Sequence, residues 1–301
     1  MIDIIKKYIL ENSIGYIDEN LSFKDLTTFR IGGKIRLVYF PDSIENFIKF
    51  DKKMKEINED YLVIGNGSNI LASDNYYNKI VVSFKKLKVK YFIINDEFFL
   101  FPQLKVNEIV RKFIELGYCD IEYFSGIPGT IGGLLTMNAS CFEKVISDYL
   151  IEALVVYDDG VKWLKKEELD FKYRSSKIKE EKMVLLLAKM KFPKTNNKKE
   201  IYDNLVKLLK IRNQKQPVNY KSAGCAFKNL CDKKAWEIIK ELGYCGKRVG
   251  GAKVSEKHCN FILNDNNASA NEVYELMKMI KEEAYNKKIL LENEWILINF
   301  D

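Results

Sequence analysis

The chain has 301 residues, 47% of them hydrophobic and 30% charged, which is typical of a globular protein that buries a large core. Its formal net charge of +7 favours acidic ligands only weakly and does not by itself indicate a nucleic-acid-binding protein. No run of about 18 uncharged apolar residues occurs, which excludes a transmembrane helix. Lys6 and Lys7 interrupt the apolar start that a signal peptide needs, so we expect a cytoplasmic protein.

The side chains available for catalysis are limited. The chain has one histidine, His258, and six cysteines without a CxxC pair, so we expect no metal site and no disulfide framework. A Ser-His-Asp mechanism could use only His258. Catalysis would otherwise depend on carboxylates, Arg, Lys, Tyr, Ser, Cys or a bound cofactor.

The hydrophobic pattern predicts a mixture of helices and strands. Apolar residues at helical spacing predict a short helix at the start of the chain, and further helices are predicted at 43–54 and 105–116. Asn95-Asp96 reads as a hairpin turn between two strands. The predicted strands are 34–40, 61–65, 79–84, 89–94, 97–101, 150–157 and 183–192.

The polar, proline-led segment 193–200 is the strongest candidate for a domain boundary. The segments predicted beyond it are helices at 200–215, 233–242 and 270–286 and a strand at 294–300. The chain is therefore predicted to be α+β with two or three subdomains.

Two glycine-rich loops interrupt this pattern. In "VIGNGSNIL" (63–71) a glycine turn follows an apolar strand, but neither the P-loop pattern GxxxxGK[ST] nor the Rossmann pattern GxGxxG is present. Free backbone amides of this kind can bind an anion, although a tight surface turn explains the segment at least as well.

The second loop, "SGIPGTIGG" (125–133), holds four glycines and precedes an apolar run, so we expect a helix whose N-terminal amides face a phosphate. Close packing of helix on sheet would explain one or two of these glycines. Together the two loops indicate a ligand with a diphosphate.

"TTFRIGG" (27–33), "VIGNGSNIL" (63–71) and "SGIPGTIGGLLTMNAS" (125–140) occur in an order and spacing that resemble the UDP-N-acetylenolpyruvoylglucosamine reductase (MurB) family. The resemblance implies a PCMH or vanillyl-alcohol-oxidase-type FAD-binding domain of two α+β subdomains plus a C-terminal α+β substrate domain. The ranges implied are 1–85, 86–193 and 194–301. The residues implied to contact FAD are Arg30, Gly65, Asn66, Gly67, Ser68, Asn69, Ser125, Gly126, Pro128, Gly129, Thr130, Gly132, Gly133 and Asn138.

Five later motifs extend the resemblance over nearly the whole chain: "YRSS" (173–176), "KQP" (215–217), "SAGCAFKN" (222–229), "RVGGAKVSEKHCNFI" (248–262) and "LENEWILI" (291–298). No insertion occurs between Asp170 and Lys191, which resembles the subtype that lacks an extra tyrosine-bearing loop. The family uses NADPH, through FAD, to reduce UDP-N-acetylglucosamine enolpyruvate to UDP-N-acetylmuramate for peptidoglycan. Another FAD-linked oxidoreductase of the same fold is the alternative, and the later motifs argue against it.

The resemblance also implies catalytic roles. A hydride from flavin N5 reaches the enolpyruvyl group, Arg174 and Glu294 stabilise the enolate, and residue 225 donates the proton. Arg174 would supply a permanently charged donor, and burial would keep Glu294 protonated. Tyr173, Lys215 and Asn229 match substrate-binding positions.

Residue 225 is where the chain departs from the family, because Cys225 replaces the serine of the pattern "AGSxF". A thiol, with a pKa of about 8.5, is a stronger acid than a hydroxyl and can donate a proton while it stays un-ionised. If Cys225 is only a small buried residue, the chain is a catalytically impaired paralogue that binds flavin and UDP-sugar.

Two smaller departures are "NASCF" at 138–142, which affects the expected flavin contacts, and Trp295, which affects the position of the Glu294 carboxylate. We expect a monomer whose partners are the enolpyruvyl UDP-sugar and NADPH, using one pocket in turn. We expect no binding of nucleic acid and no membrane insertion.

Overall fold

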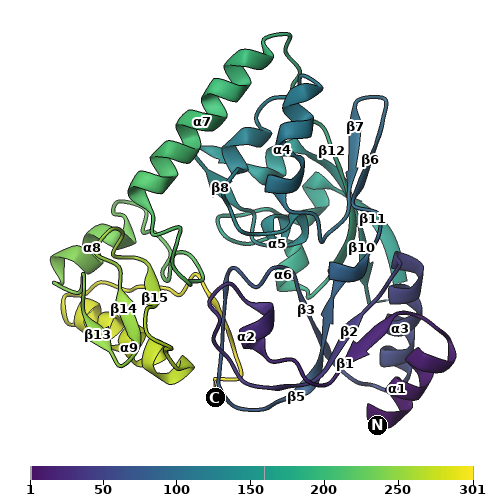
Figure 1. Cartoon of the computed structure of the whole chain (residues 1–301), viewed down its shortest axis with the longest axis horizontal. Helices are drawn as coiled ribbons and strands as arrows, with labels where there is room; N and C mark the ends of the chain where they lie inside the picture. Colours follow the sequence, from purple (N-terminus) through teal and green to yellow (C-terminus); the bar gives the residue numbers. More distant parts are fainter. Residues whose placement is uncertain (1, 159, 301) are drawn as a thin grey trace. The chain divides into compact units, whose positions relative to one another are not determined.

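The chain forms two compact units that are interleaved along the sequence. Unit 1 comprises Met1–Asp18, Leu37–Asn66 and Lys79–Lys210, and unit 2 comprises Glu19–Arg36, Gly67–Asn78 and Ile211–Asp301. The computed structural model describes residues 2–158 and 160–300 (Figure 1). The three predicted domain ranges stay a prediction, but two short segments of the first range belong to unit 2.

The first part of unit 1 is a small sheet covered by two amphipathic helices. Its strands lie in the order β1 (Tyr16–Asp18), β2 (Ile35–Phe40), β5 (Tyr77–Ser83), β3 (Tyr61–Ile64), with β1 antiparallel to β2 and β3 parallel to β5. The helices are α1 (Ile2–Glu11) and α3 (Ile44–Glu56). Ser43 begins α3 as predicted, because its hydroxyl accepts a hydrogen bond from the Asn46 N–H at 3.1 Å.

The second part of unit 1 is an antiparallel five-stranded sheet, β11 (Gly160–Lys165), β10 (Leu150–Tyr157), β12 (Val184–Met190), β7 (Glu97–Leu100), β6 (Tyr91–Ile94) (Figure 1). Asn95 and Asp96 turn between β6 and β7 with φ of 49° and 62°, so the predicted hairpin is confirmed. The remaining elements of unit 1 before residue 198 are η1 (Phe84–Lys86), α4 (Val106–Glu115), η2 (Ile121–Phe124), α5 (Ile131–Thr136), β8 (Ser140–Cys141), β9 (Lys144–Val145), η3 (Ile146–Tyr149), η4 (Lys166–Leu169) and α6 (Lys177–Glu180).

Helix α7 (Lys198–Lys215) leads from unit 1 into unit 2. In unit 2, β13 (Arg248–Val249), β14 (Ala252–Val254) and β15 (Ile262–Asn264) form an antiparallel sheet, and β16 (Ile296–Ile298) pairs in parallel with β4 (Ile70–Ala72). The helices are α2 (Phe23–Leu26), α8 (Ala235–Glu241) and α9 (Ala270–Asn286).

The core of unit 2 combines residues from distant parts of the sequence. Trp295 is 3% exposed and packs edge-on against Phe29, with ring centroids 5.2 Å apart. Leu71 of β4 lies in the same hydrophobic cluster. The bulk of Trp295 is therefore accommodated in the core of the unit.

Two cysteines form a disulfide, which the sequence analysis did not expect. Cys245 and Cys259 are joined, with their Cα atoms 5.2 Å apart. In the described part of the chain, no cluster of side chains is suited to hold a metal ion. Likewise, none of the helices within residues 2–158 and 160–300 is long and apolar enough to cross a membrane.

An aromatic cluster centred on Phe98 stabilises the second part of unit 1. The Phe98 side chain is fully buried, and its ring centroid lies 4.2 Å from Phe113, 4.6 Å from Tyr118 and 5.6 Å from Phe192. Removing the ring would lose its transfer free energy and leave a cavity.

We expect Phe98→Ala to lower the free energy of unfolding by about 3–5 kcal/mol. Phe92→Ala is the matched control, because Phe92 lies on the edge strand β6, is 38% exposed and should cost less than about 1.5 kcal/mol. Denaturant titration of the two variants measures both values. Equal losses would contradict this assignment of the core.

Candidate active site

The loop that follows β3 presents backbone donors. Within the described residues, the N–H groups of Asn66, Gly67 and Ser68 donate no hydrogen bond to another part of the chain. Gly67 has φ +61°, and a Cβ there would lie 2.6 Å from the Leu26 carbonyl oxygen. Glycine is therefore required at this position, and the donors lie in a turn that no other residue type would form without strain.

The two glycine-rich loops touch each other in unit 1. Asn66 Nδ2 donates to the Pro128 carbonyl oxygen at 2.5 Å. A Cβ at Gly65 would lie 2.6 Å from Thr130 Oγ1, so the bare backbone of Gly65 permits this approach. The sequence separates these segments by about 60 residues, and the fold brings them side by side.

The amides at the start of α5 differ from the expectation. The helix does begin at Ile131, and Thr130 Oγ1 accepts from the third amide. However, the Ile131 N–H donates to the Leu104 carbonyl oxygen at 2.8 Å, and the Gly132 N–H donates to that of Pro102 at 3.0 Å. The N–H groups of Ile131 and Gly132 are therefore used within the chain, and the predicted phosphate contact of this loop stays a prediction for its other residues.

Gly132 follows the packing alternative. A Cβ there would lie 3.0 Å from the Pro102 Cβ, so this glycine allows the helix to approach the neighbouring turn closely. At the other end of the loop, Asn107 Oδ1 accepts from the Gly126 N–H at 2.8 Å and from Ser125 Oγ at 3.3 Å. Sequence reasoning missed Asn107, since no local pattern connects it to the loop.

Asn138 is buried close to the end of α5 and has one unused acceptor. Its Nδ2 donates to the Lys172 carbonyl oxygen at 3.0 Å. Its Oδ1 is inaccessible to solvent and has no hydrogen-bond partner in the part of the chain that the structure describes. A buried acceptor without a donor costs about 1–3 kcal/mol, so this oxygen is suited to a ligand that brings an N–H or O–H group.

Arg174 lies in a two-residue turn. Lys172 and Ser175 exchange backbone hydrogen bonds of 3.0 and 3.2 Å, and Arg174 between them has φ +56°. Its guanidinium donates to Ser140 Oγ at 3.0 Å and lies 5.2 Å from the centroid of the Tyr173 ring. These contacts fix the direction of the charged group.

This turn is tied to α5. Ser176, which is fully buried, donates its hydroxyl hydrogen to the Thr136 carbonyl oxygen at 2.8 Å. The Asn138–Lys172 hydrogen bond joins the same two segments, because Asn138 lies two residues after Thr136 and Lys172 lies two residues before Arg174. The second glycine-rich loop, α5 and the Arg174 turn therefore form one connected part of unit 1.

Cys225 and Glu294 lie on neighbouring segments of unit 2. The Glu294 N–H donates to the Ala226 carbonyl oxygen at 2.8 Å, and the Lys228 N–H donates to that of Glu292 at 2.9 Å. These bonds pair the two segments in antiparallel fashion, as does the bridge between residues 227 and 293. The backbone of Cys225 is therefore adjacent to that of Glu294.

Asn260 holds the Cys225 segment in place. Its Oδ1 accepts from the Phe227 N–H at 2.9 Å, and its Nδ2 donates to the Phe227 carbonyl oxygen at 2.8 Å. Its own carbonyl oxygen accepts from the Ala226 N–H at 2.8 Å, and the residue is 2% exposed. The motif "KHCNFI" contained this residue, but its function as a clamp depends on contacts 33 residues away.

Asn69 and Arg30 hold the backbone as well. Asn69 Nδ2 donates to the Glu294 carbonyl oxygen at 3.0 Å, and Asn69 O accepts from the Ile296 N–H at 3.0 Å. Arg30, with φ +59°, donates through Nη1 to the carbonyl oxygens of Lys24 and Asp25 at 3.4 and 3.3 Å. Both residues thus hold backbone segments of unit 2 in place.

The remaining predicted residues also lie in unit 2. Lys215 is exposed at the end of α7. Asn229 accepts from the Ala235 N–H at 3.0 Å through Oδ1 and so stabilises the start of α8. Of the three predicted catalytic residues, Arg174 belongs to unit 1, and Cys225 and Glu294 belong to unit 2.

Two buried groups have shifted pKa values. Burial raises the pKa of Glu122, whose Oε1 accepts from Asn204 Nδ2 at 3.0 Å. Burial lowers the pKa of His258 below its usual 6.5, and its ring packs edge-on against Phe261 at 4.9 Å. His258 is therefore neutral at neutral pH, which agrees with a structural role rather than proton transfer.

Because the pKa of His258 is lowered by folding, the unfolded chain binds the proton first as the pH falls below about 6.5. Its contribution to stability is present above that pH and is lost below it. We expect wild type to lose more stability than His258→Gln between pH 7.5 and 5.5, by at most about 1.4 kcal/mol per pH unit. Denaturant titration at both pH values measures the difference, and parallel pH responses in the two proteins would contradict it.

The fold, together with a family model and the relatives described next, defines an FAD-binding flavoprotein. Residues 35–164 match the family model described as "FAD binding domain". Residues 216–298 match the model described as "UDP-N-acetylenolpyruvoylglucosamine reductase, C-terminal domain".

Similar proteins extend this result to almost the whole chain. A UDP-N-acetylenolpyruvoylglucosamine reductase of Caldicellulosiruptor bescii is 35% identical over 295 residues, which cover 95% of this chain and 92% of the relative. The reductase of Clostridium tetani is 33% identical and covers 99% of this chain and 97% of that relative. The crystal structure of the reductase (MurB) from Thermus caldophilus superposes with a TM-score of 0.81 at 29% identity, over 94% of this chain and all of that one. The chain belongs to the UDP-N-acetylenolpyruvoylglucosamine reductase family.

Proposed function

We propose that this protein reduces UDP-N-acetylglucosamine enolpyruvate to UDP-N-acetylmuramate with NADPH, as a UDP-N-acetylmuramate dehydrogenase of peptidoglycan precursor synthesis. The observation that carries the proposal is that one chain contains both the FAD-binding domain and the family's C-terminal domain. Another FAD-linked oxidoreductase of the same fold would share only the first of these. Bound FAD, reduced by NADPH, supplies the hydride that saturates the enolpyruvyl double bond.

The first task of the chain is to hold the FAD. The free N–H groups of residues 66–68 suit a diphosphate, and they are pre-organised by the contact between Asn66 and Pro128. The unused acceptor of Asn138 suits an N–H group of the flavin ring. The remaining predicted contacts, from Ser125 to Gly133, stay part of this proposal, although the amides of Ile131 and Gly132 are already used within the chain.

The second task is to stabilise negative charge on the substrate. Arg174 is a permanently charged donor that Ser140 and the Tyr173 ring orient, so little reorganisation is needed when charge develops. Glu294 would act from unit 2 as a neutral carboxyl group that donates a hydrogen bond. Lys215 and Asn229 would bind the UDP-sugar, with Tyr173.

The third task is to deliver a proton. Cys225 is half-buried, and Asn260 fixes the backbone of the two residues that follow it. A thiol held in this way donates its proton to the carbon next to the new C–H bond, and the thiolate recovers a proton from water. The overall reaction consumes one NADPH and one proton for each enolpyruvyl group. We further propose that the protein works as a cytoplasmic monomer.

The assay that tests the function is NADPH oxidation by the purified holoprotein. We expect a visible flavin spectrum and NADPH oxidation that requires the enolpyruvyl UDP-sugar. UDP-N-acetylglucosamine without the enolpyruvyl group is the control and should support no oxidation. A flavin-loaded protein that oxidises no NADPH with this substrate would refute the proposal and favour the impaired paralogue.

The role of Cys225 is tested by two substitutions. Cys225→Ala should lower kcat by about 10²–10⁴-fold, because no general acid remains, whereas Cys225→Ser should keep activity within about tenfold of wild type. Cys231→Ala is the control, since Cys231 is exposed and has no assigned role. Near-wild-type rates for both Cys225 variants would remove this residue from the mechanism.

A further inference from the structure

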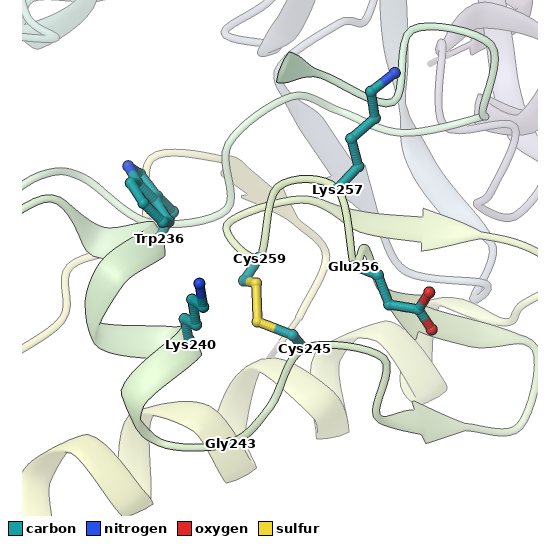
Figure 2. A pocket seen from close by; sticks show the side chains of 7 residues that line it. All are labelled: Trp236, Lys240, Gly243, Cys245, Glu256, Lys257 and Cys259. Carbon is teal, nitrogen blue, oxygen red and sulfur yellow. A yellow bond between two sulfur atoms is a disulfide. The ribbon is translucent and has the colours of Figure 1, made fainter. Parts of the chain in front are cut away.

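The Cys245–Cys259 disulfide lines a pocket of about 250 Å³ in unit 2 (Figure 2). The pocket is open to the surface, so a small molecule that enters it meets the disulfide. The residues that line the pocket are Trp236, Lys240, Gly243, Cys245, Glu256, Lys257 and Cys259.

The two sulfur atoms differ in their surroundings. Cys259 is 4% exposed, whereas Cys245 is half-buried and follows the turn at the end of α8. A thiolate in the pocket would therefore reach Cys245 more readily, and Cys259 would be the leaving group.

The charges of the pocket favour this chemistry. Two cationic side chains, Lys240 and Lys257, and one anionic side chain, Glu256, line it. Figure 2 shows Lys240 on α8 beside the disulfide and Glu256 on the loop opposite. The Lys257 ammonium donates to the Asn213 carbonyl oxygen, and Glu256 pairs with Lys253 at 3.1 Å. Lys240 is therefore the cation that attracts anionic thiols to the disulfide and stabilises thiolates there.

The disulfide also connects to the segment that carries Cys225. Cys259 directly precedes Asn260, whose side chain and carbonyl oxygen make the three hydrogen bonds to Ala226 and Phe227. The bond between Cys245 and Cys259 therefore restrains the turn from which Asn260 acts.

We propose that Cys245 and Cys259 form a thiol–disulfide exchange site for small anionic thiols, and that the oxidised state holds the Asn260 clamp. A thiolate attacks Cys245 Sγ, the bond to Cys259 breaks, and Cys259 leaves as a thiolate that takes a proton from water. A second thiolate then attacks the outer, small-molecule sulfur of the mixed disulfide, and Cys245 leaves as a thiolate that takes a proton from water. One protein disulfide and two thiols give one protein dithiol and one small disulfide, and a small disulfide such as oxidised glutathione reverses the reaction.

The first experiment measures the exchange itself. The holoprotein is equilibrated in buffers with different ratios of reduced to oxidised glutathione, quenched in acid, alkylated and analysed by peptide mass spectrometry. We expect Cys245 and Cys259 to become alkylated together along one two-electron curve, while exposed Cys231 follows a different one. Full alkylation at every ratio, or protection at every ratio until the protein is unfolded, would overturn the proposal.

The second experiment tests the direction of attack and the charge. With oxidised glutathione, Cys259→Ser should accumulate a mixed disulfide on Cys245, and Cys245→Ser should form about tenfold less on Cys259. Lys240→Gln should slow exchange with glutathione several-fold more than exchange with uncharged 2-mercaptoethanol. Equal adducts in the two cysteine variants, or equal slowing with both thiols, would contradict the assigned roles.

The third experiment tests the link to catalysis and rests on the proposed reductase activity, whereas the alkylation experiment does not. We expect kcat of the wild type to fall about two- to fivefold as the disulfide is reduced, with the same midpoint as the alkylation. Cys245→Ser should show a constant kcat over the same range. A wild-type kcat that does not follow the redox state would overturn the link to the clamp, while loss of all activity at every ratio would count against the proposed function instead.

Discussion

The arrangement of unit 1 depends on the close approach of two backbone turns. Because Gly65 has no side chain, Thr130 Oγ1 can lie 2.6 Å from the position that a Cβ would occupy. The Asn66–Pro128 hydrogen bond then holds the turns together and leaves the amides of residues 66–68 free of partners in the described chain. If these amides bind the FAD diphosphate, as we propose, the contact orders them before binding, because a mobile loop would lose binding energy on ordering.

Unit 2 is organised by side chains that bind backbone. Asn260 satisfies both polar groups of Phe227, and Asn69 binds the carbonyl oxygen of Glu294. A buried side-chain amide whose oxygen and N–H group are both hydrogen-bonded stiffens the segments to which it binds. Cys225 and Glu294 therefore lie on segments that these backbone contacts hold in place.

Sequence reasoning succeeded where a local pattern carries the structure. The hairpin at Asn95-Asp96, the cap at Ser43 and the helix at 270–286 were all predicted and are confirmed. It did not find β4, a three-residue strand inside a motif that reads as a turn. Short strands of this kind are defined by their partner, here β16, and not by their own composition.

In the candidate site as well, local motifs could be recognised in the sequence, whereas contacts between distant segments could not. The glycines and Arg174 can be selected from sequence motifs. The hydrogen bonds from the first α5 amides to Pro102 and Leu104 cannot be predicted in this way, because they depend on a turn about 30 residues earlier. The support from Ser140 and Asn260 and the Cys245–Cys259 pairing likewise depend on tertiary contacts. Residue roles are therefore easier to infer from sequence than the neighbours that make those roles possible.

The interleaving of the two units has a consequence for synthesis of the protein. Phe29 and Leu71 belong to the same core as Trp295, which lies near the end of the chain. During translation these early apolar residues are made long before their partners, so unit 2 cannot close its core until Trp295 has left the ribosome. Unit 1, which needs nothing beyond residue 210, can fold while the rest is still being made.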